Sequence, residues 1–199
     1  MSVLSRDEIE QRLNTNGINS IIVTPILDKI EQINQIGIDC RLSNQFIIFK
    51  TQNIESYDIK KFIDNPQYSR KYQKEVIIPF GESFVLHPQT MVLSSTFEFV
   101  SLPNDIEASI EGRSSWARTG LMIATAVYVD PGFKGCITLE LCNLSNVPLK
   151  LFPGMRIGQI VFGKTSSPSK YEDRKYQYPI GPEISKIKND DDNLFFLNF

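Results

Sequence analysis

The residues with the clearest capacity for chemistry lie between residues 112 and 143. Arg113 and Arg118 flank two serines, Ser114 and Ser115, and a glycine stands at each end of this segment. A glycine-flanked turn can direct backbone N–H groups toward an anion. Serine hydroxyls and the arginine fork add further donors for phosphate oxygens. The segment predicts a phosphate-binding turn, and the simpler alternative is a polar turn with two surface arginines.

A carboxylate stands inside the apolar run CITLEL, residues 136–141. In a strand, the isoleucine and leucines would alternate with Glu140, which would then share a face with Cys136 and Thr138. A carboxylate in apolar surroundings is costly unless it is paired, and buried carboxylates are frequent general bases. Two interpretations stay open for Glu140: a general base, or a structural partner of an arginine.

A third candidate is Asp130, the first residue of DPGFKG. Its carboxylate could accept a hydrogen bond from a sugar hydroxyl, although aspartate before Pro-Gly is also a common turn former. A zinc site is not expected. His87 is the only histidine, the three cysteines form no CxxC pair, and the H-x-E and P-C-x-x-C motifs of zinc nucleobase deaminases are absent.

The bulk composition narrows the class of protein. The 199 residues carry a formal net charge of −2, which does not predict a nucleic-acid surface. No apolar run approaches the ~20 residues that span a bilayer, and the charged N-terminus does not resemble a signal peptide. Three scattered cysteines fit buried thiols in a reducing compartment. We therefore expect a cytoplasmic protein that binds neither nucleic acid nor membrane.

The elements that would position these residues are mostly short strands. Ser5 and Glu8 have the capping-box spacing, which predicts a helix over residues 5–14. Short β-rich runs then follow one another, separated by Pro, Gly, Asn and Ser: residues 20–26, 38–42, 45–50, 75–80, 83–88, 90–102, 106–112, 136–141 and 157–162. The pattern indicates an all-β sandwich or barrel in a single domain, residues 1–199. We expect residues 51–74 to form a polar surface excursion, and the tail 163–199 to pack loosely until a ligand or partner orders it.

Four motifs together resemble the dCTP deaminase family of the trimeric dUTPase superfamily. They are G-R-S-S-x-A-R-x-G-L-M, T-A-x-x-x-D-P-G-F, G-x-I-T-L-E-L-x-N and L-x-P-G-M-R-I-G-Q, and the resemblance runs through nearly the whole chain. It implies a distorted jelly-roll β-barrel of the dUTPase-like type with a short N-terminal helix. It also implies a homotrimer with active sites at the subunit interfaces, and deamination without zinc.

The resemblance assigns a role to each matching residue. Glu140 matches the catalytic glutamate, Ser114 and Arg118 match residues that hold the water and that glutamate, and the Ala126 carbonyl matches an acceptor for the base amino group. The remaining matches are substrate contacts: Arg113 and Ser115 for the triphosphate, Asp130 for the deoxyribose 3′-hydroxyl, Thr138 and the Leu139 backbone for the base, and Gln159, Tyr171 and Lys175 for the triphosphate from the later part of the chain. Magnesium would bind through the triphosphate oxygens.

Some positions depart from the family pattern. The loop Ile123-Ala124 is one residue shorter than in family members, where it is linked to feedback by thymidine triphosphate, so weak or absent feedback is expected. Val127 and Tyr128 also differ. In the tail, Tyr178, Pro179 and Ile180 stand where the family has a second glutamine or a basic residue, which predicts altered closure over the triphosphate.

Three functions agree with this pattern. The first is deamination of dCTP to dUTP and ammonia, in pyrimidine deoxynucleotide biosynthesis. The second is a bifunctional enzyme that also cleaves dUTP to dUMP and pyrophosphate. The third is a nucleotide-binding regulatory trimer without turnover. A dUTPase without deaminase activity is less favoured, because Glu140 would then have no deaminating role.

Overall fold

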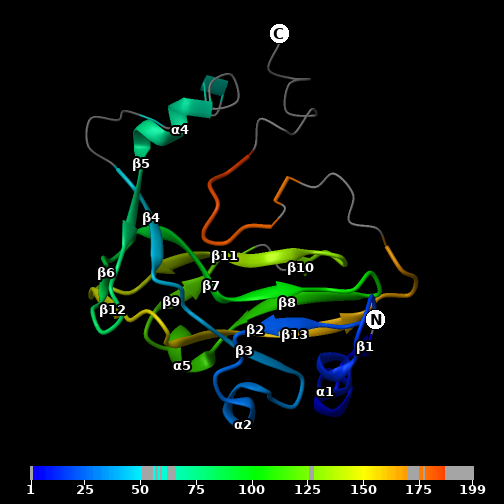
Figure 1. Ribbon diagram of the computed structural model, residues 1–199. Helices are drawn as coiled ribbons and strands as arrows, with labels where there is room; N and C mark the ends of the chain where they lie inside the picture. Colours follow the sequence, from blue (N-terminus) through cyan, green and yellow to red (C-terminus); the bar gives the residue numbers. More distant parts are fainter. Residues whose placement is uncertain are drawn as a thin grey trace.

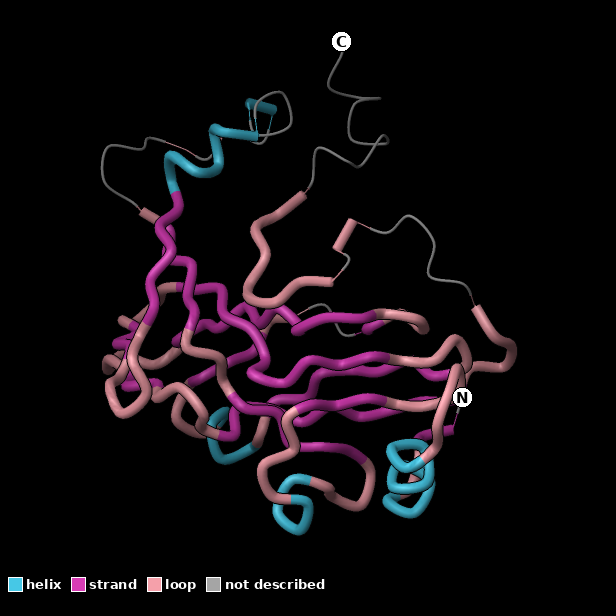
Figure 2. Tube along the Cα trace, in the orientation of Figure 1, coloured by secondary structure: helices cyan, strands magenta, loops and turns pink. Residues whose placement is uncertain are grey.

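The computed structural model describes residues 2–50, 56, 58, 60–61, 66–125, 128–169, 175–176 and 178–186. These residues form mainly antiparallel strands with a few short helices, which confirms the predicted all-β class (Figures 1 and 2). No helix in these ranges is long and apolar enough to cross a membrane.

The N-terminal helix α1 (Arg6–Asn14) begins where the capping box predicts. Ser5 is its N-cap: the hydroxyl accepts from the Glu8 N–H, and the Glu8 carboxylate accepts from the Ser5 N–H at 2.8 Å. Each contact satisfies a backbone group that the helix end or its cap leaves unpaired. Ile9 is fully buried, so one face of α1 packs on the core. Arg12 pairs with Asp105 at 2.6 Å and ties α1 to the body of the protein.

The first sheet is organised around β13. One edge of β13 pairs with β8, which in turn pairs with β10, and the opposite edge is shared by β1 and β3. The strands of this sheet are β1 (Ser2–Val3), β3 (Gly37–Arg41), β8 (Ile106–Gly112), β10 (Tyr128–Val129) and β13 (Arg156–Lys164).

The second sheet follows the order β5-β4-β7-β11-β9, and β2 also pairs with β7. Its strands are β2 (Ile22–Thr24), β4 (Gln45–Phe49), β5 (Gln73–Ile77), β7 (Met91–Ser101), β9 (Leu121–Ile123) and β11 (Lys134–Asn143). The pairing of β11 with β7 shifts register between Cys136 and Thr138. A small third sheet joins β6 (Phe84–Leu86) to β12 (Leu149–Leu151).

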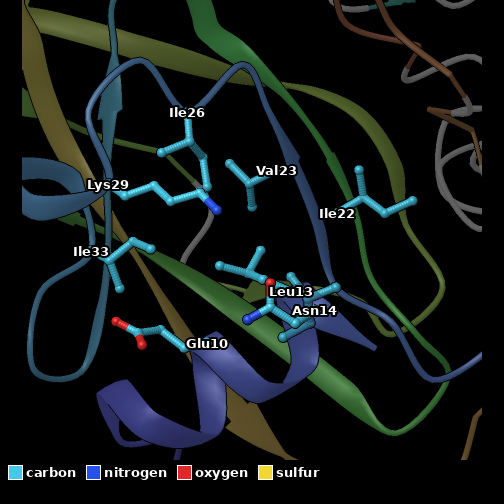
Figure 3. A pocket seen from close by; sticks show the side chains of 9 residues that line it. Glu10, Leu13, Asn14, Ile22, Val23, Ile26, Lys29 and Ile33 are labelled. Carbon is cyan, nitrogen blue, oxygen red and sulfur yellow. The ribbon is translucent and has the colours of Figure 1, made fainter. Parts of the chain in front are cut away.

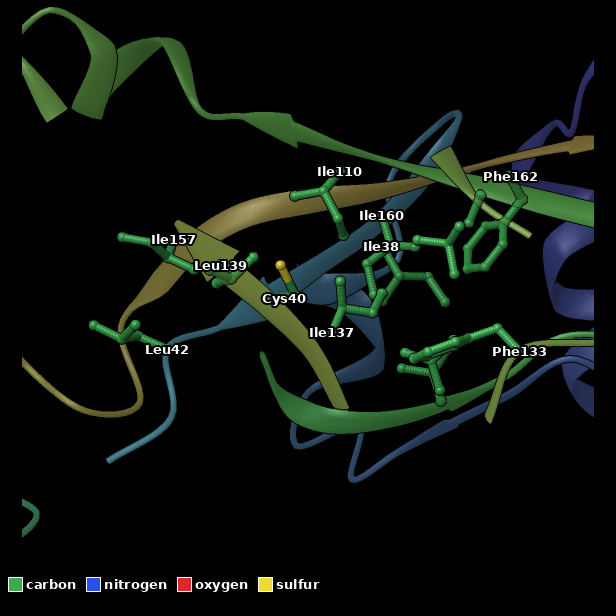
Figure 4. Close-up of a cluster of buried hydrophobic side chains, with 14 of the residues drawn as sticks. Ile38, Cys40, Leu42, Ile110, Phe133, Ile137, Leu139, Ile157, Ile160 and Phe162 are labelled. Carbon is green, nitrogen blue, oxygen red and sulfur yellow. The ribbon is translucent and has the colours of Figure 1, made fainter. Parts of the chain in front are cut away.

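The hydrophobic core takes side chains from both large sheets (Figure 4). Ile38, Ile160 and Phe162 come from the first sheet, and Ile137 and Leu139 come from β11 in the second. All five are less than a tenth exposed. Because β11 buries its odd-numbered residues here, its even-numbered residues point away from the core.

The remaining helices are short: α2 (Lys29–Gln32), α4 (Pro66–Tyr72) and α5 (Ser114–Ala117). The prediction of a surface excursion over residues 51–74 falls partly outside the described residues, which here are 56, 58, 60–61 and 66–74. Its described end is more regular than predicted, because α4 leads directly into β5, which pairs with β4. Figure 1 shows α4 projecting beyond the two sheets.

Candidate active site

Glu140 occupies a fixed position on β11, beside the end of β9. The pairing with β9 covers residues 141–143 of β11. Two more hydrogen bonds extend this contact: the Ala124 N–H donates to the Glu140 carbonyl at 2.8 Å, and the Glu140 N–H donates to the Thr125 hydroxyl at 3.2 Å. The backbone of Glu140 is therefore held by the segment that follows β9.

The Glu140 carboxylate is half-buried, and one of its oxygens is left without a partner. Oε2 is shielded from solvent and accepts no hydrogen bond from the described residues. Among these residues no ion pair includes Glu140, so the interpretation as a structural partner of an arginine gains no support. A buried, unsatisfied carboxylate oxygen is costly in a purely structural role. Such an oxygen is suited to accept a hydrogen bond from a bound ligand.

The neighbours of Glu140 along β11 confirm the predicted alternation. Thr138 and Cys142 are half-buried like Glu140, whereas Leu139 and Leu141 are fully buried. Burial raises the pKa of the Cys142 thiol, and the nearby Glu140 carboxylate raises it further. Cys136, which the sequence places on the same face, is buried instead. The open part of this face thus carries Thr138, Glu140 and Cys142.

Residues 178–183 of the tail lie along the first half of β11 and are packed more closely than the prediction for the tail 163–199 implies. The Cys136 N–H donates to the Pro179 carbonyl at 2.7 Å, and the Tyr178 N–H donates to the Lys134 carbonyl at 2.9 Å. Farther along, the Glu183 N–H donates to the Thr138 hydroxyl at 3.1 Å. The first two contacts join backbone groups, and the third uses the Thr138 side chain.

Pro179 has a packing role that its sequence context does not predict. It is buried, and its ring lies so close to Gly135 that a Cβ atom at Gly135 would overlap it. Gly181 is also buried, against the side chain of Gln45. Tyr178 adopts a positive φ of 52°, and Ile180 is exposed. Glu140 therefore lies between the segment after β9 and the docked tail.

The predicted phosphate-binding turn connects β8 to α5. Arg113 is the N-cap residue of α5, with extended φ and ψ, and the Arg118 N–H donates to the Ser114 carbonyl at 3.1 Å. Ser114, Ser115 and Arg118 are exposed. The turn thus presents two hydroxyls and one guanidinium to solvent, a donor set suited to phosphate oxygens.

Arg113 contacts a residue that the sequence did not single out, Asp39, and Gln159 is the strand partner of that residue. The Arg113 guanidinium donates to Asp39 Oδ2 at 2.8 Å. Gln159 on β13 stands opposite Asp39 on β3, and its side chain lies over Gly37. The available signal was a carboxylate inside the strand-like run IDCRL, the same kind of signal that singled out Glu140.

The other predicted site residues are not joined to Glu140 by contacts between described side chains. No hydrogen bond or ion pair of this kind links Glu140 to Ser114 or Arg118, although α5 leads into β9, which pairs with β11. Asp130 is exposed in a turn that its own carbonyl closes with the Phe133 N–H at 3.2 Å. Lys175 is half-buried. Ala126 and Tyr171 lie outside the described residues.

A second buried carboxylate, Glu98 on β7, has structural partners. Its oxygens accept from the Arg41 N–H at 2.8 Å and from the Gln32 amide at 3.2 Å. Burial raises the pKa of Glu98 from 4.5 to about 6, although these hydrogen bonds act in the opposite direction. Gln32 belongs to α2, so Glu98 attaches this helix to both sheets.

A cavity of about 400 Å³ lies between α1 and the β2–α2 segment (Figure 3). Isoleucine and leucine side chains form most of its wall, and Glu10 and Lys29 add one charge of each sign. None of the predicted site residues lines it, so the candidate site rests on Glu140 and the Arg113 turn. Among the described residues no group of three or more His, Cys, Asp or Glu is placed to hold a metal ion.

Comparison with known proteins first identifies the fold. The solved 2′-deoxycytidine 5′-triphosphate deaminase from Agrobacterium tumefaciens superimposes with a TM-score of 0.61 at 19% identity, over 82% of this chain and 48% of that chain. The present chain thus spans about half the length of that protein. At this identity the likeness establishes a shared, mostly β fold.

Comparison of sequences then identifies the family. The family model described as dCTP deaminase-like matches residues 3–165. A protein from Methanosphaera stadtmanae named "dCTP deaminase, dUMP-forming" is 41% identical over 96% of this chain and 97% of its own length. A protein of the same name from Dictyoglomus thermophilum is 41% identical over 94% and 96%. A "dCTP deaminase" from Halorubrum lacusprofundi is 38% identical over 94% and 92%. This chain belongs to the dCTP deaminase-like family.

Proposed function

We propose that this protein deaminates dCTP and also cleaves the triphosphate, so that it releases ammonia, dUMP and pyrophosphate. The observation that carries the deaminase assignment is the shielded, unpartnered Oε2 of Glu140 beside Thr138. The sequence analysis placed dUTP first as the product and dUMP second. Three relatives at 41% identity are all named dUMP-forming, which favours the second alternative.

In the proposed reaction Glu140 acts as general base and then as general acid. Its carboxylate takes a proton from a water molecule as the water oxygen attacks C4 of the cytosine. It passes this proton to N3 of the base, then takes the proton of the new C4 hydroxyl and gives it to the amino group, which leaves as ammonia while the C4 carbonyl forms. Thr138 and the Leu139 backbone would contact the base, and the exposed Asp130 would contact the sugar 3′-hydroxyl.

The triphosphate would bind at the Arg113 turn. Ser114, Ser115 and Arg118 offer exposed donors, and Gln159 lies near Arg113 through Asp39. This donor set of hydroxyl, amide and guanidinium groups suits phosphate oxygens better than a metal ion. Magnesium would accordingly be held by the triphosphate oxygens and would neutralise part of their charge.

We also propose a cytoplasmic homotrimer with its sites between subunits. Within one chain, no hydrogen bond or ion pair between described side chains joins Glu140 to the Arg113 turn, which connects β8 of the first sheet to β9 of the second. A neighbouring copy that brings its Arg113 turn to Glu140 would assemble a complete site. The free cysteines Cys40, Cys136 and Cys142 agree with a reducing compartment.

Product analysis tests the proposal directly. Purified protein is incubated with dCTP and magnesium, and separately with dUTP, and ammonia, dUTP, dUMP and pyrophosphate are quantified. We expect ammonia, dUMP and pyrophosphate in equal amounts from dCTP. Accumulation of dUTP without dUMP would show that the protein only deaminates dCTP. Absence of ammonia would overturn the proposal. A parallel sample dialysed against a zinc chelator should keep its activity.

A further inference from the structure

The Arg113 turn is linked to Arg156, at the start of β13, through Asp39 at one end and directly at the other. At the first end, Asp39 Oδ2 accepts from Arg113 Nη1 at 2.8 Å and lies 3.4 Å from Arg156 Nη1. At the other end, the Trp116 indole N–H donates to the Arg156 backbone carbonyl at 2.8 Å. The Arg156 side chain thus acts on the first end through Asp39, and its backbone contacts the other end of the segment that carries Ser114 and Ser115.

Asp39 links Arg113 to Arg156 in this arrangement. Its side chain is only 6% exposed, and Oδ1 accepts from the Asn34 amide at 2.8 Å, so both oxygens are occupied. A buried carboxylate requires such partners to stay charged. Two guanidinium groups share this carboxylate, and the Glu31 carboxylate lies 3.3 Å from Arg156, so the cluster holds two charges of each sign. Arg113 uses only Nη1 in this contact, so the rest of its fork is available to an anion.

Arg156 is itself fixed from a third direction. Its Nη1 donates to the Glu31 carbonyl at 2.9 Å and lies 3.3 Å from a Glu31 carboxylate oxygen, so α2 limits the rotation of this guanidinium. Trp116 is half-buried and its ring packs against the core. These contacts make the orientation of the turn depend on Arg156 and on Trp116. Residue 116 is the variable position x of the family motif.

We propose that Arg156 and Trp116 are positioning residues for the triphosphate contacts, acting through Arg113 and the two serines. The inference rests on the proposed function, because it takes the turn to be the triphosphate site. Neither residue needs to touch the reacting atoms. Loss of either attachment leaves the turn free to adopt orientations in which Arg113 and the serine hydroxyls no longer converge on one phosphate.

The test uses Arg156→Gln, which removes the guanidinium that holds Asp39 beside Arg113, and Trp116→Phe, which removes the hydrogen bond to the carbonyl of residue 156 but keeps an aromatic ring in the core. We expect each variant to raise the KM for dCTP about 10- to 100-fold, the equivalent of one charge-assisted hydrogen bond, with kcat nearly unchanged. Inhibition by deoxycytidine, which has no phosphate, should not change. Arg156→Lys keeps the charge near Asp39 and should recover part of the affinity.

A matched control is Arg12→Gln, which breaks the similarly half-buried Arg12–Asp105 pair on α1. This variant should keep the wild-type KM. Trp116 is the only tryptophan, so its fluorescence reports the turn in wild type, Arg156→Gln and the control. We expect a red-shifted emission in Arg156→Gln alone, and a nucleotide titration followed by this signal that shows the same loss of affinity. Calorimetry supplies the dissociation constant for Trp116→Phe.

Failure of the inference can be distinguished from failure of the proposed function. If the wild type does not release ammonia from dCTP, the function is wrong, and the nucleotide titrations still report whether Arg156 controls triphosphate binding. If the wild type is active but both variants bind dCTP like Arg12→Gln, the inference is overturned. An equal loss of deoxycytidine and dCTP affinity would also overturn it, because the effect would then not be specific to phosphate.

Discussion

Replacing Glu140 by glutamine separates a catalytic carboxylate from a structural one. The substitution keeps the side-chain shape but removes the proton acceptor. Because Oε2 has no hydrogen-bond donor among the described residues and Glu140 forms no ion pair with them, the substitution removes few stabilising contacts. We expect the free energy of unfolding to change by about 1 kcal/mol or less. Deamination should fall about 10²- to 10⁴-fold, the usual contribution of general acid–base catalysis.

The assay measures melting temperature, dCTP affinity and ammonia release on the same preparation. Glu75→Gln, which neutralises an exposed carboxylate on β5, is the matched control and should leave all three unchanged. If Glu140 were instead half of a buried ion pair, its loss would destabilise the protein by about 3–5 kcal/mol. Near-normal ammonia release from a folded Glu140→Gln variant would refute the catalytic role.

Three further predictions concern the tail, pH and feedback. Gly135→Ala and Gly81→Ala both place a side chain at positive φ, at a cost of about 1–2 kcal/mol. Only Gly135→Ala also displaces Pro179, so it alone should speed proteolysis of the tail and slow turnover. Because burial raises the pKa of Glu98 from 4.5 to about 6, protonated Glu98 favours the folded state. This contribution to the free energy of unfolding is complete below pH 4.5 and is lost as the pH rises through about 6. Urea titrations should show the wild type losing about 2 kcal/mol more than Glu98→Gln between pH 4.5 and 7. Thymidine triphosphate should inhibit weakly, and strongly sigmoidal dCTP kinetics in its presence would contradict the reasoning from the short Ile123-Ala124 loop.

Local sequence signals predicted individual elements better than their arrangement. The Ser5–Glu8 capping box marks the start of α1, and the alternation around Glu140 marks β11. Both depend on residues only a few positions apart. The helix α4 was missed within a polar excursion, although Pro66 at its first position is a helix-start signal. Strand order could not be predicted, because β1 and β13 pair across most of the chain and no local pattern specifies that contact.

The sequence predicted residues of the candidate site but not the neighbouring residues that hold them in place. Glu140 and the turn from Arg113 stood out because charge in an apolar strand and paired arginines are visible in a short window. Asp39 gives the same signal as Glu140, but its importance appears only when β3 is placed beside β13. The tail contacts made by Pro179 were not foreseeable, because they use backbone groups, which every sequence possesses.

The central place of β13 has a consequence for how the chain folds during synthesis. Among the strands of the described residues, β13 (Arg156–Lys164) is the last to be made, yet β1, β3 and β8 all pair with it. The second sheet has all its strands once residue 143 is available, whereas the first sheet has only the short β8–β10 pair until β13 arrives. Folding therefore ends with the insertion of one strand between partners made much earlier. Such high contact order predicts slow folding, with long exposure of the apolar face of β8 to chaperones on the ribosome.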